Sequence, residues 1–167
     1  MTTRNSKEPG CIGDRYDGED ALLLSNQLCF PLYAAARKIV RFYTPVLAEY
    51  GLTYTQYIAL LALWETDGIS VKSLGQRLFL DSGTLTPLLK KLESQGLLTR
   101  TRDTRDERNV EIRLTDDGRD LKAKALAIPA QIASCIDVSP EEAAELKRLL
   151  EKFLAEDSST EDSSAED

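Results

Sequence analysis

The sequence predicts a mainly α-helical fold in which a helix-turn-helix is followed by a two-stranded wing, with further helices on both sides. Three observations support this fold class. Two successive segments, residues 71–78 and 84–95, carry leucines at helical spacing, and two strand-like segments joined by a charged turn follow them. Longer amphipathic patterns lie before and after this region. Residues 20–155 are therefore expected to form one folded domain around one core.

The first helix of the central pair is expected over Val71–Leu78. Ser70 directly precedes it and is a favourable N-cap residue. Leu74 and Leu78 are one helical turn apart, so they fall on the same face. We expect this helix to be short and amphipathic, with a turn over residues 79–83.

The second helix is expected to begin between Asp81 and Thr84 and to end near Gln95. Gly96 then follows, and glycine readily adopts the left-handed conformation that terminates many helices. Pro87 lies inside this segment. A start as late as Thr84 would place Pro87 in the first turn, where its missing N–H costs no hydrogen bond.

The leading end of this second helix carries small hydroxyl side chains, and its flank carries two lysines. Such groups can face base edges and phosphates without steric cost. We therefore predict that residues 70–114 bind DNA and that the first turn of this helix contacts the bases. The candidate residues are Ser82, Thr84, Thr86, Lys90 and Lys91.

A hairpin is expected from two strands, Leu97–Arg102 and Asn109–Leu114. Its tip is rich in charge, and Arg105 or Arg108 can enter a narrow minor groove, where the negative potential is concentrated. Asp106 can hold the guanidinium in one bidentate pose. The alternative is that this charged tip is simply solvated.

The helices that flank this region are expected to form a homodimer interface. A helix capped by Thr115 is expected to continue through residue 128, with a kink at Pro129, and a last helix is expected to begin at Pro140 within a capping box. Both have wide apolar stripes, of which one small core uses only part. The dimerisation segments are residues 20–50 and 115–155.

Cys29 lies just before Pro31, a residue that would either kink a helix or begin one. If a helix begins there, its partial positive charge favours the thiolate and raises its reactivity. Tyr43 and Tyr54 follow, and a capping box that starts at Thr53 would hold Tyr54 in a helical first turn. A phenol can donate a hydrogen bond to a thiolate. Alternatively, both tyrosines are ordinary core or interface aromatics.

Two sequence stretches, DSGTLTPLLKKLESQGLL from Asp81 and TRDTRDERNVEIRLTDDGR from Thr101, resemble the MarR family of winged-helix transcriptional regulators. The resemblance covers roughly residues 24–154. It implies a homodimer that binds a pseudopalindromic operator in double-stranded DNA, with half-sites about one helical turn apart.

The stretch NQLCFPLY from Asn26, with the tyrosines downstream, resembles the organic-hydroperoxide-sensing (OhrR-like) branch of that family. This resemblance implies a redox-sensing repressor in which an organic hydroperoxide oxidises Cys29. It also implies that Tyr43 and Tyr54 of the partner subunit donate hydrogen bonds to the sulfur.

The sequence contains three cysteines: Cys11, Cys29 and Cys135, the last expected near the end of the helix that begins at Thr115. A reducing cytoplasm argues against structural disulfides, so a pair that forms should be transient. Resemblance to the two-cysteine subclass makes Cys135 of the opposite subunit the resolving thiol. The alternative for Cys135 is a small buried hydrophobe. Cys11 is either a bystander or a competing resolver.

Charge is unevenly distributed along the 167-residue chain, whose net charge is −7. Residues 156–167 hold six acids and no bases in a Ser-rich segment, which we expect to be a disordered tail. Residues 72–113 carry nine Lys and Arg against six Asp and Glu, so the predicted DNA-binding part is positive. Residues 1–19 are expected to be a flexible leader. The chain has neither a signal peptide nor an apolar membrane span, so we expect it in the cytoplasm.

The sequence fits several other functions less well. A thiol peroxidase would be an enzyme, but the chain has no histidine to serve as base and no Cys-x-x-Cys. A zinc site lacks the required ligand spacing, and no cofactor is expected. An architectural DNA binder is disfavoured by the acidic balance. The main alternative is a MarR-type repressor that a small aromatic or phenolic ligand releases from DNA, with Cys29 passive.

Overall fold

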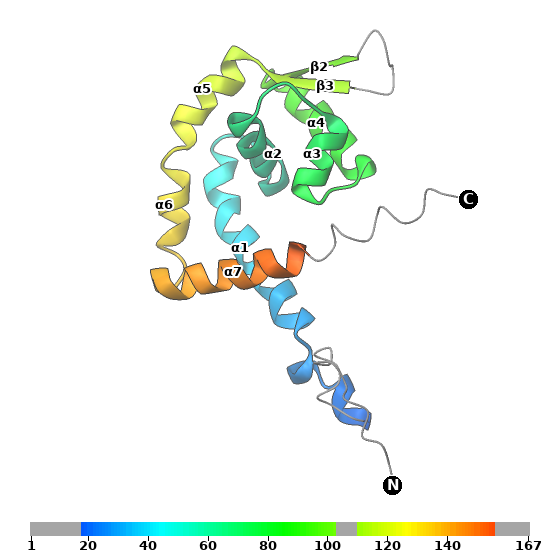
Figure 1. Cartoon of the computed structure of the whole chain (residues 1–167). Helices are drawn as coiled ribbons and strands as arrows, with labels where there is room; N and C mark the ends of the chain where they lie inside the picture. The colour runs from blue at the N-terminus through cyan, green and yellow to red at the C-terminus, as the bar shows by residue number, and fades with distance from the viewer. Residues whose placement is uncertain (1–17, 103–109, 156–167) are drawn as a thin grey trace, which may run out of the picture. The chain divides into compact units, whose positions relative to one another are not determined.

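The computed structural model describes residues 18–102 and 110–155, and Figure 1 shows the order of its elements. The chain divides into two compact units, residues 1–128 and residues 129–167. In the first, a helical N-terminal part leads into a helix-turn-helix and a small sheet. Among the described residues, none of the helices combines the length and apolar character needed to cross a bilayer.

The N-terminal part consists of two short 3-10 helices, Gly18–Leu22 and Leu24–Asn26, and then helix α1, Cys29–Ala48. Helix α1 begins at Cys29, so of the two alternatives for Pro31, a kink or a helix start, the structure has the helix start. Helix α2, Tyr54–Glu65, opens with the predicted capping box, in which Thr53 and the side chain of Gln56 satisfy each other's backbone N–H groups.

The helix-turn-helix has the predicted bounds. Helix α3 spans Val71–Leu78, and the Ser70 hydroxyl accepts a hydrogen bond from its third N–H group. Helix α4 spans Ser82–Ser94, and Gly96, just after its C-cap Gln95, has the expected left-handed conformation with a φ of 75°. Pro87 is the sixth residue of α4 rather than a first-turn residue, because the helix begins at Ser82.

A three-stranded antiparallel sheet follows the helix-turn-helix, in the order β1-β3-β2. Strands β2, Leu98–Arg102, and β3, Val110–Leu114, form the predicted hairpin. The sequence did not reveal strand β1, Ile69–Ser70, which pairs with the middle of β3. Two residues are too few to produce a periodic pattern, and β1 exists because β3 offers it a free edge.

The hydrophobic core lies between α2, the helix-turn-helix and the sheet. Buried leucines of α2 and α3 meet those of α4, and Ile112 of β3 is fully buried. The main core side chains are Leu60, Leu63, Leu74, Leu85, Leu89, Leu92 and Ile112. This core holds α4 with its leucines inward and its polar residues outward.

The C-terminal helices differ from the prediction in one respect. Helix α5, Asp116–Ala125, is capped by Thr115 as expected, but it ends before residue 128 instead of bending at Pro129. A separate helix, α6, spans Ile128–Ala133. Proline cannot donate the backbone hydrogen bond that a continuous helix would need there. Helix α7, Pro140–Ala155, has the predicted capping box at Ser139.

Candidate functional site

The leading turn of α4 is exposed, and Asp81 is its N-cap. The Asp81 carboxylate accepts hydrogen bonds from the backbone N–H of Thr84 at 2.9 Å and from its hydroxyl at 2.8 Å. These two hydrogen bonds hold the pKa of Asp81 below its usual range, and the bond from the backbone N–H has the larger effect. A side chain at Gly83 would crowd this carboxylate, since its Cβ would lie 2.9 Å from Oδ1. The local sequence therefore fixes the geometry of the turn predicted to contact DNA.

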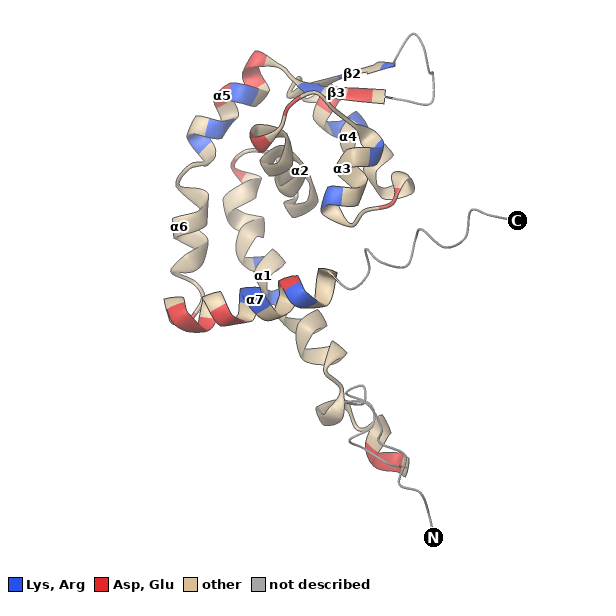
Figure 2. Cartoon of the chain, viewed as in Figure 1, with Lys and Arg blue, Asp and Glu red and all other residues tan. Residues whose placement is uncertain are grey.

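The predicted DNA-binding side chains of α4 are all exposed: Ser82, Thr84, Thr86, Lys90 and Lys91. The hydroxyls of Thr84 and Thr86 donate to Asp81 and to the Ser82 carbonyl, so both present their oxygens outward as acceptors. Figure 2 shows basic residues on α3 as well as on α4. The structure thus places these residues together on one element.

The predicted wing-tip residues, Arg105, Asp106 and Arg108, lie outside the described residues. Of the described wing cations, Arg100 is bound to Glu93 of α4 at 2.6 Å, and this pairing lowers the pKa of Glu93. Arg113 pairs with Glu111 on the same strand. Both ion pairs tie their guanidinium groups to the protein surface.

Three tyrosines form a cluster where α1 meets α2. The ring centroids of Tyr43 and Tyr54 lie 4.9 Å apart, and Tyr57 is 5.7 Å from Tyr43. Burial raises the pKa of both Tyr43 and Tyr54, and the neighbouring Tyr54 raises that of Tyr43 further. Each phenol therefore keeps its proton at neutral pH and remains a hydrogen-bond donor.

Tyr57 is not among the residues predicted from the sequence, although its spacing of three residues from Tyr54 places both on one helix face. It is almost fully buried and also packs edge-on against Trp64, with 6.3 Å between ring centroids. Tyr57 is therefore the buried member of the cluster, whereas Tyr43 and Tyr54 are each partly exposed.

Cys29 is exposed at the first position of α1, and its Sγ lies 4.0 Å from Oε1 of Gln27. Tyr43 is on the same helix, about 20 Å farther along the axis at 1.5 Å per residue. A rigid helix cannot fold back on itself, so the sulfur cannot reach the phenol of its own chain. The structure of one chain keeps the predicted sensor residues apart.

The surface around Cys29 is apolar and uncovered. Leu28, Phe30 and Tyr33 are all exposed, as are Ile39 and Val40 farther along α1. Helix α7, in the second unit, likewise exposes its apolar residues: Leu146, Leu149, Leu150, Phe153 and Leu154. Large apolar faces of this kind are typical of surfaces that another protein covers.

Cys135 belongs to the second unit and lies in the turn just after α6, not within a helix as predicted. Helix α6 ends at Ala133, and the thiol contacts the carbonyl oxygen of Gln131 at 3.5 Å. Its side chain is exposed, which argues against the alternative of a small buried hydrophobe. Cys11 lies outside the described residues.

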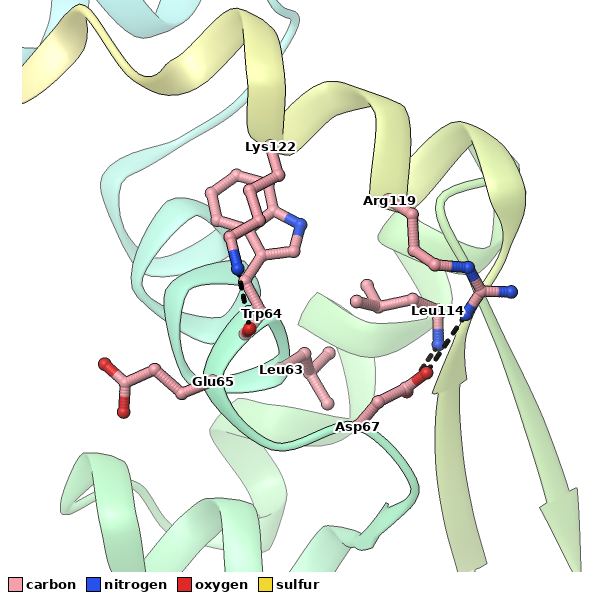
Figure 3. Close-up of a pocket in the computed structure, with 7 residues that line it drawn as sticks. All are labelled: Leu63, Trp64, Glu65, Asp67, Leu114, Arg119 and Lys122. Carbon is pink, nitrogen blue, oxygen red and sulfur yellow. Dashed lines mark hydrogen bonds and ion pairs between the residues drawn. The ribbon is translucent and has the colours of Figure 1, made fainter.

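A pocket of about 380 Å³ lies at the end of α2. Figure 3 shows Arg119 and Lys122 reaching from α5 toward α2 and the loop that follows it. The lining residues are Leu63, Trp64, Glu65, Asp67, Leu114, Arg119 and Lys122. Within the described part of the chain, no cluster of His, Cys, Asp or Glu has the composition of a metal site.

Comparison with known proteins gives consistent matches. The family model "Transcriptional regulator SarA/Rot" matches residues 41–125. The organic hydroperoxide resistance transcriptional regulator of Bacillus subtilis is 50% identical over 135 residues, which are 81% of this chain and 92% of that protein. The regulator SarZ of Staphylococcus saprophyticus is 48% identical, over 78% of this chain and 90% of its own.

A solved structure also matches closely. Reduced AbfR bound to DNA, a protein of Staphylococcus epidermidis, superposes with a TM-score of 0.69 and 39% identity, covering 78% of this chain and 89% of that one. Disulfide-formed AbfR superposes with a TM-score of 0.57 and 40% identity, covering 78% and 92%. The winged-helix fold predicted from the sequence is thereby confirmed.

Proposed function

This chain belongs to the family of MarR- and SarA/Rot-type winged-helix transcriptional regulators, within the branch that includes the organic hydroperoxide regulator, and on that premise we propose that it is a redox-sensing repressor. A homodimer in the cytoplasm binds a pseudopalindromic operator while Cys29 is reduced. Oxidation of Cys29 by an organic hydroperoxide releases the dimer from DNA.

One observation carries the proposal. The rings of Tyr43 and Tyr54 have centroids 4.9 Å apart, and both phenols are protonated. The thiol of Cys29 is on α1, the helix that also carries Tyr43, about 20 Å away along its axis. A sulfur and two donors can meet only if a second copy supplies one of the two parts. The uncovered apolar surface around Cys29 is suited to that second copy.

The chemistry follows in two steps. The Cys29 thiolate attacks one peroxide oxygen of ROOH, so an S–O bond forms, the O–O bond breaks, and RO⁻ takes a proton to leave as ROH. The product is a sulfenic acid. The thiol of the partner's Cys135 then attacks its sulfur, forming the disulfide and releasing water. A cellular thiol restores the reduced state by disulfide exchange.

DNA binding is assigned to α4 and the wing. Ser82, Thr84 and Thr86 contact base edges, and Lys90 and Lys91 contact phosphates, with Arg105, Asp106 and Arg108 of the wing tip in the minor groove. Each good base contact contributes about 1–3 kcal/mol of discrimination. Loss of one half-site's contacts on oxidation is therefore enough to empty the operator. Reduced AbfR has been solved bound to DNA, which supports this assignment by analogy.

The test is a mobility-shift assay with a duplex that the reduced wild-type protein selects from a random-sequence library. Cumene hydroperoxide should release wild-type protein and the Cys11→Ser control, but it should leave Cys29→Ser on the DNA. Cys135→Ser should form the sulfenic acid without an intersubunit disulfide on non-reducing gels. Release of Cys29→Ser by the peroxide would refute the sensor role.

A second candidate function is a repressor that responds to a small aromatic ligand, with the cysteine passive. The pocket beside Trp64 favours it, because its wall is aromatic and two cations, Arg119 and Lys122, line it. Release of Cys29→Ser from DNA by a phenolic compound, at a concentration that also releases wild-type protein, would support this candidate over the redox mechanism.

A further inference from the structure

Asp67, in the first unit, lies between α2 and β1 and bonds residues of β3 and α5. It lies in the loop between α2 and β1, and its Oδ1 accepts hydrogen bonds from the N–H of Gly68 at 2.9 Å and from that of Leu114 at 2.8 Å. Leu114 is the last residue of β3. Its other oxygen, Oδ2, binds Arg119 of α5 at 3.1 Å (Figure 3). One carboxylate therefore joins the end of α2, the base of the wing and α5.

Three further hydrogen bonds also hold α5 in this region. The indole N–H of Trp64 donates to the carbonyl of Gly118 at 2.8 Å, and the ammonium of Lys122 donates to the carbonyl of Trp64 at 3.0 Å. Near the other end of α5, the Tyr50 hydroxyl donates to the carbonyl of Lys124 at 3.2 Å. Directional bonds of this kind fix one orientation of a helix more sharply than apolar contacts do.

Helix α5 also sits directly on the loop that begins the wing. Any side chain at Gly118 would overlap the carbonyl oxygen of Leu97. The Thr115 hydroxyl donates to the carbonyl of Gly96 at 2.6 Å. The start of α5 therefore packs against Gly96 and Leu97, the residues between α4 and β2. A change in the orientation of α5 would thus move residues next to both α4 and β2.

The same helix leads toward the proposed resolving thiol. Cys135 follows α5 by only ten residues, and α6 lies between them. A disulfide at Cys135 therefore pulls on the chain that continues α5. Asp67 bonds both Arg119 of α5 and Leu114 of β3, so it is the direct link between that helix and the wing among its described contacts.

We propose that Asp67 is a positioning residue that couples the oxidation state of the sensor to the wing, by linking α5 through Arg119 to the end of β3. This inference rests on the proposed redox function. Within the described residues, the hydrogen-bond and ion-pair partners of Asp67 are Gly68, Leu114 and Arg119, and none of these is the sensor cysteine or a predicted DNA-binding residue. The coupling is the ratio between the operator Kd of the oxidised protein and that of the reduced protein.

The test uses the full-length Asp67→Asn protein and the selected duplex described above. Asparagine keeps an acceptor for the two N–H groups but loses the charge that holds Arg119. The ratio of oxidised to reduced Kd should shrink by about two- to thirtyfold, the range by which residues in a coupling network alter such ratios. Asp116→Asn is the matched control, because it removes the guanidinium's other partner, which lies on α5 itself at 3.2 Å.

A purely structural role gives a different result. It would lower the thermal unfolding midpoint and weaken DNA binding by the same factor in both redox states, leaving the ratio unchanged, and that outcome overturns the proposal. If Asp67→Asn does not fold, Arg119→Gln carries the same test, since it leaves Asp67 bound to both backbone N–H groups. An unchanged ratio in Arg119→Gln also overturns it.

The outcome separates this inference from the proposed function. Wild-type protein that keeps its operator affinity after treatment with cumene hydroperoxide refutes the redox function, and the coupling role with it. Wild-type protein that responds normally, together with an Asp67→Asn protein that responds equally, refutes only the role of Asp67.

Discussion

Removing a single phenol hydroxyl should slow the oxidation of Cys29 without disturbing the fold. Tyr43 and Tyr54 contact each other through their rings, and burial raises the pKa of each phenol, so each remains a donor. Phenylalanine keeps the ring and its packing and removes only the donor. The Tyr54→Phe protein therefore isolates the proposed hydrogen bond to the sulfur from the structural contribution of the aromatic side chain.

The size of the effect follows from the charge on the sulfur. A hydrogen bond to a charged group contributes about 1.5–3 kcal/mol, which corresponds to about a tenfold to hundredfold change in the thiolate fraction. A less stabilised thiolate is also a better nucleophile, with a Brønsted coefficient of about 0.4–0.5, which offsets nearly half of the loss on a logarithmic scale. The net rate of oxidation should fall about four- to fifteenfold where most of the thiol is protonated.

The assay follows the loss of free thiol with a chromogenic disulfide reagent after cumene hydroperoxide is added. A background of Cys11→Ser and Cys135→Ser leaves Cys29 as the only thiol, since the chain has three cysteines. Far-UV circular dichroism and thermal unfolding, recorded on the same preparations, establish that each variant is folded.

Tyr57→Phe is the matched control, because it makes the same chemical change in the same cluster at an almost fully buried position. Its rate should equal that of the parent protein. Equal rates for Tyr43→Phe, Tyr54→Phe and the parent would refute the reasoning, since no donor from either phenol would then be acting on the sulfur.

Three further predictions concern the folded state. Hydrogen bonds lower the pKa of Asp81 in the folded protein, so the ionised carboxylate stabilises the fold above the pKa that Asp81 has in the unfolded chain. This stabilisation is lost as the pH falls through the lower pKa of the folded state. Thermal unfolding between about pH 2 and 6 should show the loss in wild-type protein, and the Asp81→Asn protein should lack this part of the pH dependence. Gly118→Ala should destabilise the protein by about 1–3 kcal/mol in urea denaturation, since the new methyl overlaps Leu97, and an unchanged midpoint would contradict that packing. Burial raises the pKa of Tyr54, so stability should fall as the pH rises above about 10, and Tyr54→Phe should lose less than wild-type protein does.

Local signals in the sequence were sufficient to predict the helix-turn-helix. Ser70 and Thr53 were identified as caps from their own side chains and those a few residues away, and both caps are present. Gly96 was identified as a helix terminator for the same reason. These features depend on neighbours along the chain, which a single sequence contains in full.

Features that depend on distant neighbours were missed. Strand β1 consists of Ile69 and Ser70 alone and is defined by its pairing with β3. Asp67 looks like an ordinary loop residue until Leu114 and Arg119 are brought to it by the fold. The sequence predicts a kink at Pro129 where the structure has a break before α6, because a proline indicates that a helix is disturbed but not whether it resumes at once. Such properties arise from tertiary packing.

The placement of Cys29 and Tyr43 far apart on one continuous helix, α1, has a genetic consequence. Every sensor in a two-fold symmetric dimer would be a hybrid, with its sulfur from one polypeptide and its donors from the other. Two defective alleles, Cys29→Ser and Tyr54→Phe, would then complement each other when co-expressed, because their mixed dimer rebuilds one intact sensor and concentrates both lesions in the second.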